Sequence, residues 1–117
     1  MFIYEKDDAR FAYELYFKEF KEKQSAINVF ARSEYSREFA NVDIFKFENS
    51  YLVVQDLNDY DCLLYDDLDE VLYCLKQFFE NFKESFLGAE IDYRIIDEDF
   101  YNDFSFEQRI ELLRVVG

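Results

Sequence analysis

The sequence predicts a small α+β domain in which an antiparallel sheet packs against a long helix with an aromatic face. Apolar residues recur at helical spacing near both ends of the chain and over 68–86, and at every second position from residue 42. The 117 residues include 15 Phe and 10 Tyr, which is ample material for a core. No stretch rich in Pro, Gly or Ser divides the chain. We therefore expect residues 1–117 to form a single acidic domain.

Both segments of the first 40 residues are predicted to be helical. Residues 7–23 carry an apolar stripe behind an aspartate that can cap the helix. Residues 25–40 are ambiguous, because Ser25 can cap a helix there, whereas residues 26–32 also fit a strand. We favour the helix over 25–40.

The middle of the chain changes to a period of two. The alternation predicts strands at 42–47, 51–55 and 60–65. Turn-forming residues separate them at 48–50 and 58–59. Because short turns join antiparallel neighbours, we expect a three-stranded meander.

The clearest element is a long helix over 67–86. Asp67 and Glu70 have capping-box spacing, and Gly88 lies where a left-handed residue would end the helix. The apolar face consists of Leu68, Val71, Leu72, Leu75, Phe78, Phe79, Phe82 and Phe86. Of these, we expect burial of Leu72, Leu75, Phe79 and Phe82.

The chain is predicted to end with a fourth strand and a helix. Residues 90–96 alternate well enough for the strand. Ser105 and Gln108 match the capping-box pattern and open a last helix whose apolar positions include Phe106 and Leu113. An order of this kind fits an antiparallel sheet with its helices packed on one face.

The negative charge is concentrated in the second half of the chain. Residues 1–48 hold ten acids and eight bases, whereas residues 49–117 hold seventeen acids and five bases, for a total of −14. Excess charge of one sign destabilises the folded chain by self-repulsion. We therefore expect a functional role that compensates for this loss of stability. A negative field attracts basic protein surfaces and opposes direct binding to DNA, RNA or anionic membranes.

The residue types argue against catalysis and metal binding. Without His, neither Ser–His nor Cys–His nucleophile pairs can form, and Cys62 and Cys74 cannot complete a cysteine-only zinc site. We expect both cysteines to be reduced core residues. Two glycines are too few for a phosphate-binding loop, and a calcium-like spacing that begins at Asp56 lacks the glycine its turn needs. We therefore expect no enzyme activity, cofactor or metal.

Two acidic clusters are the candidate binding residues. Between Lys46 and Lys76 the chain has no basic residue, and tyrosines, which are enriched at interfaces, are interleaved with the acids. Helix capping accounts for some of these acids, but not for Asp59, Asp61 or the run 97–99. The predicted partner-binding residues are Asp56, Asp59, Tyr60, Asp61, Asp66, Asp67, Asp69, Glu70, Asp92, Asp97, Glu98, Asp99, Tyr101 and Asp103.

We expect no signal peptide, because no basic region is followed by a long apolar run near the start of the sequence, and no apolar run in it is long enough to cross a bilayer. We expect a cytoplasmic protein, which would act in the cytoplasm of a host cell if a phage encodes it.

In its size, acidity, aromatic content and scarcity of Gly and Pro, the chain resembles small phage-encoded inhibitors of bacterial defence, the anti-CRISPR and anti-restriction proteins that mimic DNA. Segments 56–70 and 97–103 carry this resemblance, without a signature motif. Their carboxylates are expected about 5–7 Å apart, a spacing of the same order as that of backbone phosphates. The resemblance implies a non-catalytic inhibitor that occupies a nucleic-acid-binding groove of a nuclease or effector complex.

Two alternatives stay open. An immunity protein that neutralises a basic nuclease toxin would have the same profile. An acidic adaptor or structural protein would carry its charge for solubility alone.

Overall fold

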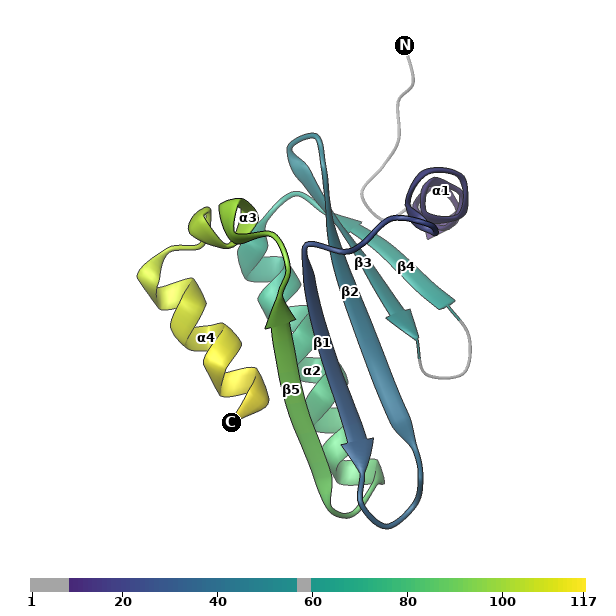
Figure 1. The fold of residues 1–117 in the computed structure, drawn as a ribbon, viewed down its shortest axis with the longest axis vertical. Helices are drawn as coiled ribbons and strands as arrows, with labels where there is room; N and C mark the ends of the chain where they lie inside the picture. Colours follow the sequence, from purple (N-terminus) through teal and green to yellow (C-terminus); the bar gives the residue numbers. More distant parts are fainter. Residues whose placement is uncertain (1–8, 57–59) are drawn as a thin grey trace.

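The computed structural model describes residues 9–56 and 60–117, which form a five-stranded antiparallel sheet with helices on both faces (Figure 1). The strands are β1 (Ile27–Ser33), β2 (Phe39–Phe47), β3 (Ser50–Asp56), β4 (Tyr60–Tyr65) and β5 (Ala89–Ile95). The helices are α1 (Ala9–Leu15), which continues as the π-helix η1 (Tyr16–Phe20), then α2 (Leu68–Ser85), α3 (Glu98–Asn102) and α4 (Phe106–Val116). The predicted α+β class is confirmed.

The sheet is a meander with one returning strand. Its order is β4-β3-β2-β1-β5, so β1 to β4 are neighbours in sequence and β5 comes back to pair with β1. The strands predicted at 42–47, 51–55, 60–65 and 90–96 correspond to β2, β3, β4 and β5. No described helix is both long and apolar enough to cross a membrane.

The helix predicted over 25–40 is wrong, because this segment contributes β1 and the start of β2. Ile27, Val29 and Ala31 alternate into the core and are buried. Since β1 pairs with β2 on one side and with β5 on the other, its backbone groups are satisfied by both neighbours. Pairing with a distant strand therefore decided the structure of a locally ambiguous segment.

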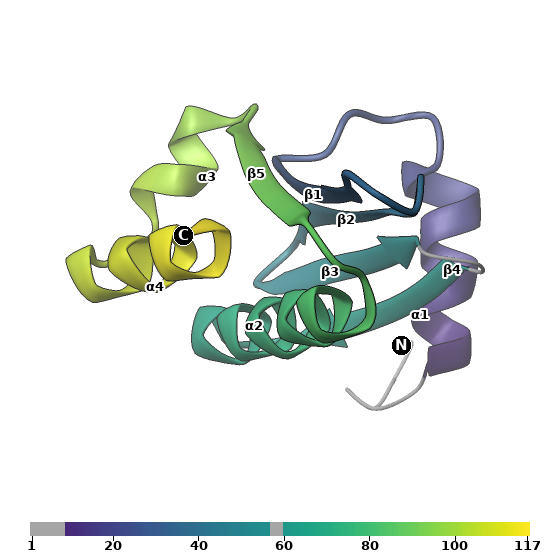
Figure 2. The same cartoon turned by 90° about the horizontal axis from the view of Figure 1, so that it is seen from below.

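Helices cover both faces of the sheet, which corrects the expectation of a single covered face (Figure 2). The alternation within β3 shows the division. Tyr51 and Val53 belong to the core under α2 and α4, whereas Leu52 and Val54 belong to a second core under α1 and η1. The second core lies over β3 and β4 and includes Phe45 of β2.

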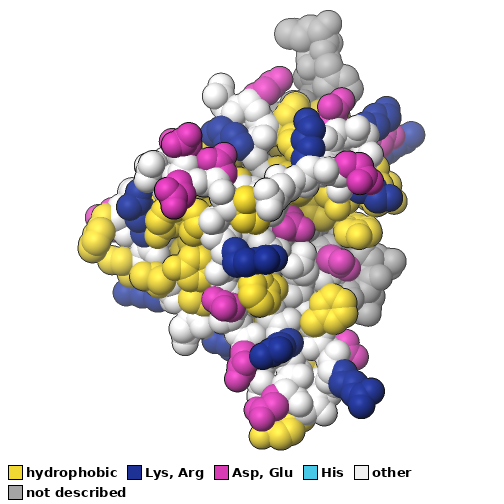
Figure 3. All heavy atoms as spheres, in the orientation of Figure 1, with side chains coloured by type: hydrophobic (Ala, Val, Ile, Leu, Met, Phe, Trp, Pro, Cys, Tyr) yellow, Lys and Arg dark blue, Asp and Glu magenta, His cyan; other side chains and the backbone are white. Residues whose placement is uncertain are grey.

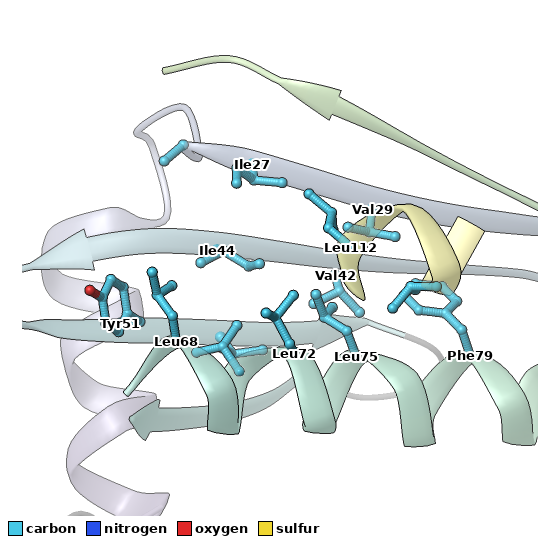
Figure 4. Packing of buried hydrophobic residues seen from close by; sticks show 14 of the residues in the cluster. Ile27, Val29, Val42, Ile44, Tyr51, Leu68, Leu72, Leu75, Phe79 and Leu112 are labelled. Carbon is cyan, nitrogen blue, oxygen red and sulfur yellow. The ribbon is translucent and has the colours of Figure 1, made fainter. Parts of the chain in front are cut away.

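Helix α2 is the main element packed against the sheet. Its N-cap is Asp67, whose carboxylate accepts a hydrogen bond from the Asp69 backbone N–H at 2.9 Å. The predicted core positions of this helix are confirmed, and they face the strands together with Leu112 of α4 (Figure 4). The buried set comprises Leu68, Val71, Leu72, Leu75, Phe79 and Phe82.

Gly88 turns the chain from α2 into β5. Helix α2 already ends at its C-cap Phe86, whose backbone is extended, so Gly88 does not terminate the helix as predicted. It has a positive φ of 72°, and a Cβ at this position would lie 2.7 Å from the ring of Tyr35. The positive φ therefore favours glycine, whereas the Tyr35 ring is exposed and can shift.

We expect Gly88→Ala to lower the free energy of unfolding by about 1–2 kcal/mol through the left-handed backbone alone. Displacement of the exposed Tyr35 ring should add little to this cost. Urea denaturation of Gly88→Ala, with and without Tyr35→Ala, separates the two contributions. Unchanged stability in the single variant would contradict this account of the turn.

The terminal helices are confirmed, with differences in detail. The first helix ends at Phe20, and the aspartate expected to cap it lies outside the described residues. Helix α4 begins with the predicted capping box, in which Ser105 and Gln108 exchange bonds of 3.1 and 2.8 Å. The core contacts of α4 come from Leu112 and Val115, whereas Phe106 and Leu113 are exposed.

Candidate protein-binding surface

The acidic segments after β4 and after β5 meet at one end of the sheet. Every pair of neighbouring strands in the sheet is antiparallel. Because β4 and β5 are four strands apart in the sheet order, they run in the same direction. The chain enters α2 directly after β4, and it enters α3 directly after β5. Both helices therefore begin at the same end of the sheet (Figure 1).

Two contacts join these segments. The Gln108 side-chain amide donates to the Asp69 carboxylate at 3.1 Å, linking the first turns of α4 and α2. The ring of Phe100 in α3 lies edge-on to Tyr51, with 5.6 Å between centroids, and Tyr51 pairs with Tyr65 at the end of β4. We call the exposed carboxylates gathered here the acidic end: Asp66, Asp67, Asp69, Asp97, Glu98, Asp99 and Asp103.

Several of these acids also have local structural roles. Asp97 caps α3, accepting hydrogen bonds from the backbone N–H groups of Asp99 at 3.0 Å and Phe100 at 3.3 Å. The expectation that capping does not account for the run 97–99 is therefore wrong for Asp97. Asp66 accepts from the Ser50 hydroxyl at 2.8 Å. Helix α3 is too short to leave a periodic pattern in the sequence, which is why its cap was missed.

The acidic end has no compensating ion pairs within the described part of the chain. The ion pairs found among described residues lie elsewhere, at Arg10–Glu14, Arg32–Glu90 and Arg114–Glu111. Two nearby bases lie over aromatic rings instead: Lys46 over Tyr51 at 4.5 Å, and Arg109 over Tyr101 at 4.6 Å. In the space-filling view, acidic side chains gather over α3 (Figure 3). The charge there is thus directed to solvent.

The structure does not bring all predicted binding residues together. Asp56 and Asp61 lie at the opposite end of β3 and β4, and Asp61 is roughly 17 Å along the strand from Asp66. Asp92 lies in the middle of β5 on the exposed face of the sheet. Asp59 lies outside the described residues. The first acidic cluster is therefore divided.

The tyrosines and Glu70 are partly engaged within the chain. Tyr60 is exposed, but its ring contacts Tyr16 and Phe17 at centroid distances of 5.6 Å, far from the acidic end. Tyr101 is half-buried beneath Arg109 and borders the acidic end. Glu70 is half-buried and lines a pocket on the side of α2.

A groove of about 450 Å³ beside the acidic end was not foreseen from the sequence. Asp97, Glu98 and Asp99 line it together with Lys23 and Lys46, which come from distant parts of the chain. The acidic end therefore has a basic border. Only the tertiary fold brings these charges together.

A polar network on the uncovered half of the sheet was also missed. Asp43 accepts from the Ser25 hydroxyl at 2.8 Å and from the Asn28 amide at 2.9 Å, and Asn41 donates to its other oxygen at 3.1 Å. Arg94 donates to Asn28 at 3.2 Å. Asn28 is buried between Ile27 and Val29, and its polar side chain is a sequence signal that this half of the sheet has a polar face.

The described residues hold no group of His, Cys, Asp or Glu side chains that could bind a metal ion. Cys62 and Cys74 are free thiols, the first buried and the second half-buried. Burial raises the pKa of the Cys62 thiol to about 11, and it also raises the pKa of Cys74. Both side chains are therefore thiols at neutral pH.

Comparisons of the chain with protein-family models, curated proteins and solved structures found no match.

Proposed function

We propose that the acidic end binds a basic surface on another protein. The observation that carries this proposal is the meeting of two acidic segments at one end of the sheet, with carboxylates exposed and unpaired by described bases. Such a field speeds encounter with a positively charged partner. Asp97 and Asp67 are held in place by their capping bonds, so part of the surface is preorganised.

The partner in this proposal is a nucleic-acid-handling protein, whose groove the acidic end occupies without any chemical step. Exposed carboxylates spaced along two helix starts present negative charge at intervals similar to those of phosphates. The same field opposes binding of the chain itself to nucleic acid. Inhibition by competition for the groove follows from these two properties together.

The experiment is capture of a partner from lysate of the producing cell on the immobilised chain, followed by displacement. We expect duplex DNA or RNA to release the captured protein, because the nucleic acid and the acidic end of the chain would compete for the same groove of that protein. The chain alone should give no gel shift with either nucleic acid at moderate salt. Capture of a protein that excess nucleic acid does not displace would overturn this proposal, as would micromolar binding of the chain to nucleic acid.

A further inference from the structure

Strand β5 has a free edge within the described residues. It pairs with β1 only and is the outermost strand on one side of the sheet (Figure 1). The Ile96 N–H donates to Ala26 at 2.9 Å and the Glu34 N–H donates to Gly88 at 3.2 Å, so the even-numbered positions of this strand exchange hydrogen bonds with β1. The backbone N–H and C=O groups of the alternate residues therefore point to the free edge. Those residues are Ala89, Ile91, Tyr93 and Ile95.

One side-chain bond confirms this alternation. The N–H of Tyr93 donates to the carboxylate of Asp92 at 2.8 Å, so it makes a local bond at the edge. The carboxylate of the neighbouring residue thus covers a donor that another strand would otherwise use. Along the exposed face of β5 the side chains are Glu90, Asp92 and Arg94.

Helix α4, which packs beside β5, carries an exposed apolar stripe. Phe106 is 75% exposed and Leu113 is 50% exposed, with the half-buried Ile110 between them on the same side of the helix. Glu111 and Arg114 line a groove shared with α2, and Leu112 and Val115 enter the core, so the stripe lies on a different side of α4 from both. Hydrophobic side chains gather over α4 in the space-filling view (Figure 3). Figure 2 shows α4 lying out beyond β5.

We propose that β5 pairs with β5 of a second copy of this chain, antiparallel, about a two-fold axis through Tyr93. In this register the Asp92 carboxylate releases the Tyr93 N–H. Tyr93 then exchanges both ladder hydrogen bonds with Tyr93 of the other copy, and Ile91 does so with Ile95. On the exposed face, Asp92 of each copy lies opposite Arg94 of the other. On the helix side, the added strand brings its own Ile91, Tyr93 and Ile95 next to those of the first copy, as alternate side chains do in strand addition.

The charges of β5 select this register over its neighbours. The free-edge residues must pair with each other, so the axis moves one residue at a time between allowed registers. An axis through Asp92 would place the two Asp92 side chains opposite each other, and an axis through Arg94 would do the same for two arginines. Only the axis through Tyr93 gives two opposite-charge pairs and no like-charge pair on this face. Antiparallel pairing also directs the two acidic ends away from each other.

Sedimentation equilibrium of the whole chain tests the proposal. We expect a concentration-dependent shift from the 14.3 kDa chain mass to twice that mass. Asp92→Arg and Arg94→Asp each place like charges opposite each other and should weaken self-association about tenfold or more. An equimolar mixture of these two variants should associate again, because each supplies the charge that the other lacks.

The mixture also controls for folding. Arg94 donates to Asn28 and lies 5.5 Å from the Phe30 ring, so Arg94→Asp removes internal contacts as well. A misfolded variant would not regain association on mixing. A wild-type chain that stays monomeric at millimolar concentration would overturn the proposal, as would a mixture that associates no better than its components.

Cysteine cross-linking tests the register independently. Residues in a hydrogen-bonded antiparallel pair have Cα atoms about 5.5 Å apart and Cβ atoms about 5 Å apart, which is too far for an unstrained disulfide but within reach of a short reagent that links two thiols. Such a reagent should therefore link Tyr93→Cys into a covalent dimer. Ile91→Cys, which lies opposite Ile95 in the second copy, should not be linked. Cross-linking through Asp92→Cys in preference to Tyr93→Cys would show that the proposed axis is wrong.

Discussion

Replacing Phe79 with alanine should lower the free energy of unfolding by about 3–5 kcal/mol. Phe79 is 1% exposed and belongs to the core between α2 and the sheet (Figure 4). Its ring also makes an edge-on contact with Phe78, with 5.0 Å between centroids. Truncation removes this apolar burial and leaves a cavity in a region that strands and helix confine on both sides.

Phe106→Ala is the matched control for this prediction, because the same side chain is removed from an exposed position. Its effect on the unfolding free energy of the monomer should stay within about 0.5 kcal/mol. Both variants are compared by chemical denaturation at a protein concentration where the chain is monomeric. Equal effects of the two substitutions would show that α2 is not the main helix of the core.

Reversing the charge of the acidic end should slow association with the captured partner by about 10- to 1,000-fold at low salt. The most suitable positions are Glu98, Asp99 and Asp103, whose carboxylates make no side-chain hydrogen bond among the described residues. Their combined replacement by lysine should also flatten the dependence of the association rate on ionic strength. Each single substitution should change the binding free energy by only about 0–1 kcal/mol.

The control variant reverses the same number of charges on the first helical segment and in the turn that follows it. That face already carries lysines between its acids, so the change to the local field is smaller. The substitutions are Glu14→Lys, Glu19→Lys and Glu22→Lys. Stopped-flow association rates and thermal melting of both triple variants separate steering from folding. If the control slows association as much as the acidic-end variant, the charge acts as a bulk property and the contact surface lies elsewhere.

The sequence could predict the elements whose period is unambiguous. The aromatic face of α2 repeats over five turns, and no other structure buries Leu72, Leu75 and Phe79 together. Residues 25–40 could not be assigned in this way, because Ile27 and Phe30 fit a helix as well as a strand. The partners that decide the structure of β1 are β2 and β5, and β5 lies some 60 residues later.

One available signal for the covered second face was the apolar run from Tyr51 to Val54. Four successive apolar residues in a strand predict burial on both sides, and the structure places alternate residues in two cores. The acidic end had no such signal. Asp66 and Asp97 lie at the same end of the sheet only because β4 and β5 run in the same direction, which is a property of the topology.

The return of β5 to β1 also makes the acidic end depend on the order of folding. The meander from β1 to β4 uses local pairings, whereas Ile27 and Ile95 must close a long loop before they pair. Helix α3 follows β5 directly, so Asp97 reaches its place only when this last pairing has formed. A transient release of β5 would separate the two acidic segments while leaving the meander intact. The acidic end therefore has the local stability of the β1–β5 contact, which can be lower than that of the whole fold.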